Sequence, residues 1–209
     1  MATIRLLGRK TSGNVQKILW MMSEMNLAFS REDYGGPFAS LDAPAFVALN
    51  SNRLVPVLVH GDEVVWESNS ILRYLANVHG PTPLYPEEPY IRSLCERWMD
   101  WQLSSLNPCM SPLFIAMVRT AAADRDPVML ERLTAQARDL FARLDEALAA
   151  TDYLAGSSLT LADISTGMFA YRWFEMALDR GTPTPHLRRW LELLKQRAAF
   201  REYVMIGLS

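Results

Sequence analysis

The 209-residue sequence predicts an α/β domain followed by an all-α domain. Residues 3–80 alternate between short apolar runs typical of strands and amphipathic runs typical of helices. Every patterned run after residue 86 has helical spacing. The stretch between them, PTPLYPEEP, contains four prolines and favours a linker. We therefore expect the first domain at residues 1–80, the linker at 81–86 and the helical domain at 87–209.

The first domain is expected to contain four strands and three helices. Val15, Ile18, Leu19, Met22 and Met25 recur at helical spacing, which predicts a helix with one apolar face. Two β-rich runs flank HGD, a turn sequence that predicts a hairpin. The expected elements in order are a strand at 3–7, a helix at 14–26, a strand at 27–33, a short helix capped by Asp42 and ending at Asn50, the hairpin at 55–67 and a helix closed by Gly80.

The second domain is expected to consist of helices at about residues 90–118, 127–149, 160–179, 184–196 and 198–204. Pro108 and Pro112 are expected to kink the first of these helices and open a cleft. Thr160 and Asp163 form a Thr-x-x-Asp pattern ahead of an apolar run. That pattern predicts a capping box, with a role in folding and none in chemistry.

Composition excludes several classes of function. The formal net charge is −2 and no basic run of five or more residues occurs, so we expect no nucleic-acid partner and no membrane partner. The N-terminal apolar run is too short for a secretory signal, and no stretch approaches the ~20 apolar residues of a membrane span. Cys95 and Cys109 form no CxxC motif, and we expect both to be reduced in a cytoplasmic protein.

Three short stretches carry candidate chemistry. Ser12 and Asn14 lie where the first strand passes into a helix, either as a cap or as a site for an anion. Val55 precedes a proline at the start of a strand. That proline is either a simple strand start or part of a cis bond that turns the Val55 main chain toward an extended ligand.

The third stretch is Glu67-Ser68, at the turn from a strand into a helix. Ser68 is the expected N-cap, and Glu67 would favour the positive end of the helix. The same geometry suits a ligand. The Ser68 hydroxyl and the free N–H groups can take a carboxylate, and Glu67 can pair with an ammonium. A carboxylate and an ammonium on one carbon make an amino-acid head group.

These elements together resemble the cytosolic glutathione transferases. The resemblance rests on the order of elements, LVPVL at 54–58, ESNSILRYL at 67–75, the proline-rich linker and the helical second half. It implies a thioredoxin-like first domain that binds glutathione as a substrate. It also implies that Glu67 and Ser68 take the γ-glutamyl head, and that Val55 pairs with the cysteinyl backbone.

A bacterial subgroup close to the theta and nu branches gives the best resemblance. The matching segments are GRKTSGNVQKILW, GGPF, WESNSILRYL, WMDWQ and RAAFREYVMIGLS. Ser12 matches the catalytic serine of theta-like enzymes, and Asn14 matches the asparagine that nu-like enzymes present to the thiol. No tyrosine or cysteine occurs in the first 33 residues, which argues against the tyrosine-using and thiol-transfer branches. Lowering a thiol pKa by roughly 2 units needs about 2.7 kcal/mol, within reach of one or two charge-assisted hydrogen bonds.

The sequence departs from the family at one position in the glutathione grip. Relatives usually carry a small residue three positions before the proline, and Arg53 stands there in this chain. Arg53 is expected either to bind the glycyl carboxylate in a bidentate manner or to be a solvated loop residue.

The second substrate is expected to lie over the thiolate, between the domains. Candidate walls of this electrophile pocket are Trp101, Met110, Leu113, Phe114 and Met117. Arg119 is a candidate for contact with an anionic or polar co-substrate.

The resemblance implies a glutathione transferase that activates the thiolate to attack a small hydrophobic electrophile, by conjugation or dehalogenation. No metal is expected. The alternative is a non-catalytic glutathione-binding module in regulation or stress. Glutathione-dependent isomerisation and disulfide reduction rank lower, because their signatures are absent. A homodimer is expected by analogy with the family.

Overall fold

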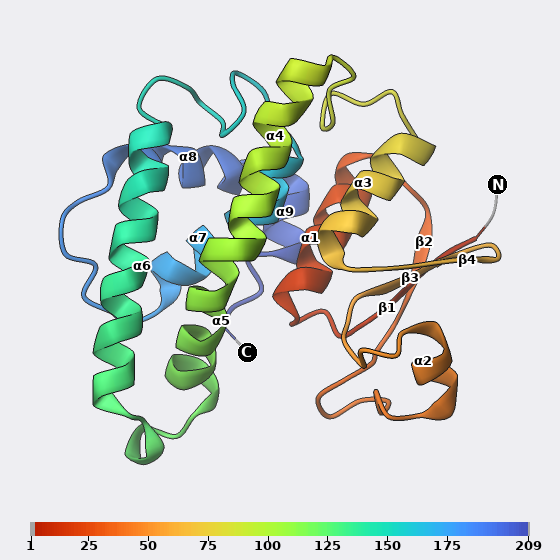
Figure 1. Ribbon diagram of the computed structural model, residues 1–209, viewed down its shortest axis with the longest axis horizontal. Helices are drawn as coiled ribbons and strands as arrows, with labels where there is room; N and C mark the ends of the chain where they lie inside the picture. The colour runs from red at the N-terminus through yellow and green to blue at the C-terminus, as the bar shows by residue number, and fades with distance from the viewer. Residues whose placement is uncertain (1–2, 209) are drawn as a thin grey trace.

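The computed structural model describes residues 3–208 and confirms the predicted fold class. A four-stranded sheet and its helices form the first part, and helices alone form the second (Figure 1). Helix α1 (Gly13–Glu24) belongs to the first part but packs against helices of both parts. Among the described residues no helix is long and apolar enough to cross a membrane.

The sheet has the strand order β2-β1-β3-β4. Its strands are β1 (Ile4–Leu7), β2 (Phe29–Glu32), β3 (Val57–His60) and β4 (Glu63–Trp66). Strand β1 runs parallel to β2 and antiparallel to β3, and β3 and β4 form the hairpin expected around HGD. Gly61 in that turn has a φ of 62°, a conformation that favours glycine.

The two faces of the sheet are covered by different helices, because successive side chains of a strand point to opposite sides. Ile4, Leu6 and Leu58 belong to the main core with α1 and α3 (Ser68–Val78). Leu7, Val57 and Val59 pack instead with Phe46 of α2 (Pro44–Leu49) in a separate, smaller cluster. The face covered by α1 and α3 is the one directed toward the helical domain.

The helix expected at 90–118 is present without an intervening loop, but its winding changes three times. It comprises α4 (Pro89–Trp101), a π-helical segment η1 (Gln102–Leu106), α5 (Asn107–Phe114) and a second π-helical segment η2 (Ile115–Arg119). Pro112 lies inside α5. Such π-helical turns are rare and are often found at functional sites.

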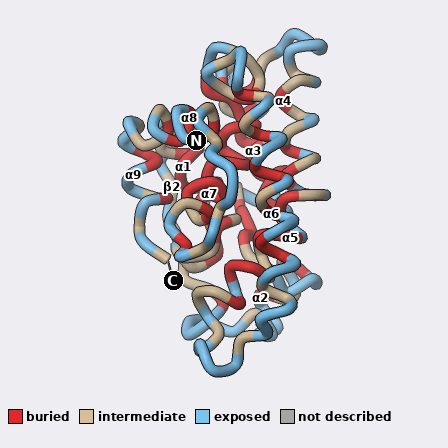
Figure 2. Tube along the Cα trace, turned by 90° about the vertical axis from the view of Figure 1, so that its left-hand side faces the viewer, coloured by how far each residue is buried: buried red, intermediate tan, exposed pale blue. Residues whose placement is uncertain are grey.

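The remaining helices surround α7 (Leu161–Glu175), most of whose residues are buried. The others are a short 3-10 segment η3 (Ala122–Asp124), α6 (Pro127–Ala147), α8 (Pro185–Lys195) and α9 (Ala198–Tyr203). A helix that is apolar on all sides must be enclosed by its neighbours. Figure 2 shows the buried residues along the centre of the molecule, where α1 and α7 lie.

Asp163 and Thr160 form the predicted capping box at the start of α7. Asp163 Oδ2 accepts from the Thr160 main-chain N–H at 2.8 Å, and Asp163 Oδ1 accepts from the Leu154 N–H and the Trp190 indole, each at 2.9 Å. The buried carboxylate therefore joins the loop before α7 to α8.

Three local expectations were wrong. Ala43, not Asp42, is the N-cap of α2, and Asp42 instead forms an ion pair with Arg53. Glu67 is the N-cap of α3, so Ser68 is the first helical residue. The helix expected at 160–179 ends at Glu175, after which the chain turns extended at Met176.

Candidate functional site

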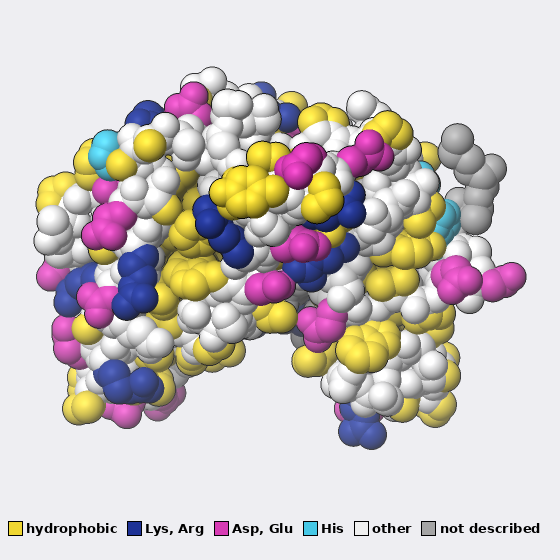
Figure 3. Space-filling view, turned by 45° about the horizontal axis from the view of Figure 1, so that its top comes forward, with side chains coloured by type: hydrophobic (Ala, Val, Ile, Leu, Met, Phe, Trp, Pro, Cys, Tyr) yellow, Lys and Arg dark blue, Asp and Glu magenta, His cyan; other side chains and the backbone are white. Residues whose placement is uncertain are grey.

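An interdomain cavity of about 130 Å³ lies where the start of α1 meets the helical domain. Its walls come from the first domain and from α5, η2 and α7. The residues that line this interdomain cavity are Arg9, Ser12, Gly13, Asn14, Asn107, Ser111, Phe114, Ile115, Arg119, Met168, Phe169 and Arg172. In the space-filling view of Figure 3, the molecule is hollowed between the lobe that carries α2 and the helical domain.

Ser12 and Asn14 both lie in the wall of the interdomain cavity, at the positive end of α1. Ser12 is the N-cap by position, but its side chain makes no capping hydrogen bond. The Ser12 hydroxyl and the Asn14 amide nitrogen donate to no other residue within 3–208. The Ser12 hydroxyl therefore does not cap α1, and it is available to donate a hydrogen bond to a bound anion.

Gly13 allows the helical domain to approach the start of α1 closely. A Cβ atom at Gly13 would lie 2.4 Å from the Met168 methyl carbon and 3.0 Å from Arg172 Nη1. Both of those residues belong to α7. A side chain at position 13 would push the ends of Met168 and Arg172 aside, so Gly13 helps to set the shape of the interdomain cavity.

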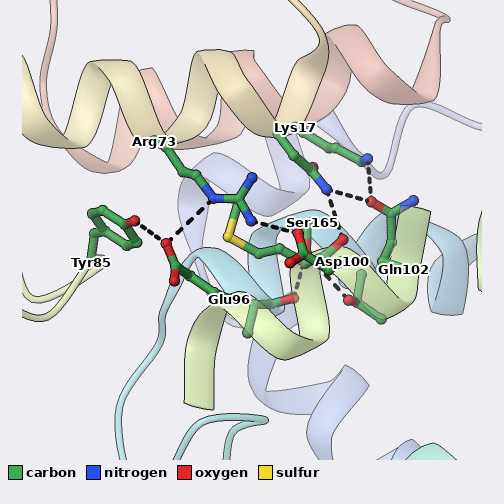
Figure 4. Close-up of polar contacts among 11 residues, drawn as sticks. Lys17, Arg73, Tyr85, Glu96, Asp100, Gln102 and Ser165 are labelled. Carbon is green, nitrogen blue, oxygen red and sulfur yellow. Dashed lines mark hydrogen bonds and ion pairs between the residues drawn. The ribbon is translucent and has the colours of Figure 1, made fainter. Parts of the chain in front are cut away.

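A chain of polar contacts links Asn14 to the interior. Asn14 Oδ1 accepts from the Ser68 hydroxyl at 3.3 Å, and Lys17 Nζ lies 3.4 Å from Ser68 Oγ. Lys17 Nζ also donates to Gln102 Oε1 at 2.9 Å, as Figure 4 shows. Gln102 is the first residue of η1, so the chain runs from the first domain into the helical domain.

Lys17 is buried completely in this interface, with 1% of its surface exposed. Burial lowers the pKa of the Lys17 ammonium to about 7, while the charge of Glu67 acts in the opposite direction. Beside it, Arg73 of α3 pairs with Asp100 and Glu96 of α4, the second polar bridge of Figure 4. One bridge joins α1 and α3 to η1, and the other joins α3 to α4.

The Glu67-Ser68 and Val55-Pro56 stretches show unusual backbone geometry. Glu67 has a φ of 70°, which costs free energy in a residue other than glycine and is often retained at functional sites. The Val55–Pro56 peptide bond is cis. Within residues 3–208 no hydrogen bond is formed by the main-chain N–H or C=O of Val55. Glu67 itself is exposed, whereas Ser68 is buried.

Arg53 lies on the surface, with 59% of its side chain exposed. Its guanidinium is 3.3 Å from the Asp42 carboxylate, and its φ is 56°. It does not line the interdomain cavity. The structure thus places Arg53 on the sheet side of the site, in an exposed ion pair.

The residues expected to wall an electrophile pocket have different locations. Phe114 lines the interdomain cavity. Met110 and Leu113 lie in the hydrophobic core, and Met117 is packed against that core. Trp101 borders a separate depression with Ser104, Ser105 and residues of α6. Helical spacing identified the inward face of this segment but not which inward residues meet a cavity.

Three arginines line the interdomain cavity, and the sequence singled out only Arg119. Arg172 packs over the Phe114 ring at 4.0 Å and donates to the Thr11 carbonyl at 3.1 Å. Burial, together with the charges of Arg119 and Arg9, lowers the pKa of Arg172 to about 10. Arg172 is a charged residue in an otherwise largely apolar helix. This feature of the sequence could have marked it as a candidate site residue.

Family comparisons assign both parts of the chain. Residues 11–78 match the family model described as glutathione S-transferase, N-terminal domain. Residues 106–197 match the glutathione S-transferase, C-terminal domain. A curated relative, glutathione S-transferase GstB of Escherichia coli strain K12, is 36% identical over 208 residues, covering 99% of this chain and all of the relative. Glutathione S-transferase 3 of Zea mays is 30% identical over 98% of this chain and 94% of its own length.

Solved structures give the same result at the level of the fold. A theta class glutathione S-transferase from Xanthomonas axonopodis pv. citri, crystallised with glutathione bound, superimposes with a TM-score of 0.95 at 42% identity, with full coverage of both chains. Ure2p in complex with glutathione has a TM-score of 0.86 at 21% identity, over 98% of this chain and 93% of its own, and so shows the fold alone. On the family models and the full-length relatives together, the chain belongs to the glutathione S-transferase family.

Proposed function

We propose that this protein binds glutathione, lowers the pKa of its thiol and directs the thiolate at a small electrophile. The family membership supports a glutathione-dependent transferase. The single observation that carries the proposal is the position of Ser12 and Asn14. Both line the interdomain cavity at the positive end of α1, with donors that no other described residue uses.

Those donors match the needs of a thiolate. An anion at the start of a helix is stabilised by the helix dipole and by free N–H groups. The Ser12 hydroxyl and the Asn14 amide add hydrogen bonds that strengthen as the thiol loses its proton. The thiolate then attacks an electrophilic carbon, which either releases a halide or takes up the sulfur across an activated double bond.

The glutathione grip is proposed on the sheet side of Ser12. The structural relative from Xanthomonas was crystallised with glutathione bound, and the Glu67-Ser68 turn of this chain offers an exposed carboxylate beside the start of a helix. We propose that Glu67 pairs with the γ-glutamyl ammonium, that Ser68 receives the carboxylate, and that the unpaired Val55 main chain bonds the cysteinyl unit. Arg53 would exchange its exposed partner Asp42 for the glycyl carboxylate.

A titration of bound glutathione tests the proposal. Thiolate absorbance near 240 nm is followed against pH for the wild type, Ser12→Ala and Asn14→Ala. We expect the wild type to depress the thiol pKa by roughly 2 units and the more important variant to restore most of that shift, with a rate loss of about tenfold to a hundredfold. Thr11→Ala is the matched control, since Thr11 contributes its carbonyl and not its hydroxyl to the contacts described.

An unshifted thiol pKa with intact glutathione binding would overturn the enzymatic proposal in favour of a non-catalytic binding module. If the wild type did not bind glutathione at all, both the enzymatic proposal and the binding-module alternative would be overturned.

We also propose a homodimer in the cytoplasm. Large apolar side chains are exposed on β4 and at the start of α4, among them Trp66 and Tyr90, with 45% and 68% of their surfaces exposed. Apolar surface of this kind is typical of protein interfaces. Sedimentation of the purified chain as a monomer at micromolar concentration would contradict the dimer.

A further inference from the structure

We propose that the electrophile is a small anion, recognised through its carboxylate or a similar group by Arg9, Arg119 and Arg172. This inference rests on the proposed function, because the anion must lie beside the glutathione thiolate. It replaces the hydrophobic co-substrate that the sequence suggested. The supporting observations are the positions of these arginines and the composition of the cavity lining around them.

Arg172 occupies a position that is unfavourable for a cation without an anion nearby. Its Nη1 atom would lie 3.0 Å from a Cβ at Gly13, in the first turn of α1. The start of a helix carries positive partial charge, which repels a guanidinium. The Arg119 guanidinium lies 5.3 Å from the centre of the same Phe114 ring, so two cations contact one aromatic side chain.

Arg9 adds a third positive charge at the other side of the interdomain cavity. Its side chain lies over the Gly35-Gly36 turn, where a Cβ at Gly35 would be 2.9 Å from Arg9 Nη1. Both glycines have positive φ angles, so this turn can accept the arginine against its backbone. Among residues 3–208, Arg9 has no acidic partner within ion-pair distance.

The lining of the interdomain cavity contains no aspartate or glutamate. Arg119 and Arg9 both disfavour the charge on Arg172, which shows that their fields overlap in this space. A cavity lined by charges of one sign concentrates the field and attracts ligands of the opposite sign. The cavity is therefore built for negative charge.

Glutathione's own charges do not account for Arg9 and Arg172. Glu67, Ser68, Val55 and Arg53, the proposed grip for its two carboxylates, are absent from the cavity lining. The thiolate brings a single negative charge, whereas Arg9 and Arg172 line the same cavity and neither has an acidic side chain within ion-pair distance among residues 3–208. A second anion is the simplest complement. The volume of about 130 Å³ is below the roughly 300 Å³ at which drug-sized ligand pockets begin, so the second anion is small.

The chemistry is a nucleophilic substitution that balances without any other reactant. The thiol gives its proton to solvent, and the thiolate sulfur attacks the electrophilic carbon. A carbon–sulfur bond forms as the carbon–halogen bond breaks, and the halide leaves with the bonding electron pair. The arginines hold the carboxylate and offset its repulsion from the approaching thiolate, which is the difficulty specific to an anionic electrophile.

Iodoacetate and iodoacetamide are the matched test pair. They share the reacting carbon and the leaving group and differ in charge. Rates of glutathione conjugation are measured at fixed ionic strength, and each kcat/KM is divided by the uncatalysed rate constant of the same reagent. We expect this normalised value to be at least about tenfold larger for iodoacetate.

Arginine-to-glutamine variants test whether the cavity causes the preference for iodoacetate. Arg9→Gln and Arg119→Gln should each lower the iodoacetate-to-iodoacetamide ratio by roughly tenfold or more, chiefly through KM for iodoacetate. Arg172→Gln is the third variant, checked by thermal unfolding because Arg172 also supports the Thr11 carbonyl. Arg132→Gln removes an exposed arginine of α6 outside the cavity and should leave the ratio unchanged.

Two outcomes would overturn the inference. If the enzyme conjugates iodoacetamide at least as well as iodoacetate, the proposed transferase stands and its anionic co-substrate does not. If the arginine variants raise KM for glutathione or the thiol pKa while the reagent ratio stays constant, the arginines serve glutathione instead. Failure to conjugate either reagent, with an unshifted thiol pKa, would remove the proposed function and this inference together.

Discussion

The burial of Lys17 lowers the stability of the fold but supports the proposed glutathione site. Its ammonium is enclosed by α3, η1 and the Phe169 ring of α7, and its hydrogen-bond partners are a hydroxyl and an amide oxygen rather than a carboxylate. Enclosing a charge with neutral partners costs free energy, and the lowered pKa expresses that cost. We infer that the lysine is kept because it holds Ser68 in place for glutathione.

Lys17→Met should therefore stabilise the fold and weaken the site. We expect the free energy of unfolding to rise by roughly 1–4 kcal/mol at pH 7, and KM for glutathione to rise by about tenfold. Chemical denaturation and steady-state kinetics give the two quantities. Lys195→Met, at a surface ion pair with Glu192, is the control and should change both much less.

The difference in unfolding free energy between Lys17→Met and the wild type should change with pH in one direction. The pKa of Lys17 is about 7 in the folded protein and has its usual value of 10.5 in the unfolded chain, so between these values the unfolded chain holds a proton that the folded chain lacks. Wild-type stability contributed by this group accordingly increases as pH rises from 7 to 10.5. The advantage of Lys17→Met should shrink across the same window. A constant advantage would show that Lys17 is not titrating there.

At the scale of the elements, α7 depends on one buried carboxylate. Asp163 accepts four hydrogen bonds, from the Leu154 and Thr160 main chains, the Thr160 hydroxyl and the Trp190 indole. An amide in its place has one acceptor atom and would direct an N–H toward another donor. The start of α7 and its contact with α8 would lose their common anchor.

Asp163→Asn should lower the free energy of unfolding by about 2–5 kcal/mol, the sum of a lost cap and an unpaired buried donor. Thermal and urea unfolding measure this loss. Asp139→Asn, at an exposed position of α6, should change stability by less than about 0.5 kcal/mol. If Asp163→Asn were as stable as the wild type, the carboxylate would have no anchoring role.

Elements were well predicted because their patterns are local. The hairpin around HGD and the Thr160 capping box depend on neighbouring residues, and both are present. The Asp42 cap failed because Asp42 turns to Arg53, which lies beyond α2 in the sequence. The π-helical turns on either side of α5 have no comparable local signature, and the expected proline kink indicated only that the helix is irregular.

At the scale of the whole molecule, the two domains share α1 as a common core. Its residues from Val15 to Met22 are all buried, on faces that turn toward the sheet and toward the helical domain. Glu24 at its end receives a bidentate pair of hydrogen bonds from Arg197, at 2.7 and 2.6 Å, and one from the Trp20 indole. We therefore expect the domains to unfold as one cooperative unit.

Glu24→Gln tests this interdomain ion pair. Burial opposes ionisation of Glu24, but the hydrogen bonds from Arg197 and Trp20 outweigh it and hold its pKa below the usual value of 4.5. The stabilisation should be present above pH 4.5 and be lost as pH falls through the lowered pKa. We expect a loss of about 1–2 kcal/mol at pH 7 that vanishes in acid.

Glu192→Gln, in an exposed pair with Lys195, is the control for the same chemical change and should cost less than about 0.5 kcal/mol. If Glu24→Gln and Glu192→Gln lowered the free energy of unfolding equally, the interdomain ion pair would stabilise the protein no more than an exposed pair does. Two separate unfolding transitions would contradict the shared core.

The site was predictable where it is built from turns and unpredictable where it is built from the approach of two domains. Ser12 and Glu67 stand at strand-to-helix turns that the sequence marks clearly. Arg172 reaches the Thr11 carbonyl from 161 residues away, and no local pattern records that approach. Met110 was an equally reasonable pocket residue by spacing, but it lies in the core because α5 presents a different face to the cavity.

The burial of Cys95 and Cys109 has a consequence for the proposed reaction with electrophiles. Both thiols lie in the core, and burial raises the pKa of each to about 11, so almost no nucleophilic thiolate forms at neutral pH. In the proposed reaction, the electrophile therefore meets no cysteine thiolate of the chain that could compete with glutathione. We expect the protein to keep both cysteines unmodified while it turns over such an electrophile, which mass spectrometry of the protein after the reaction would check.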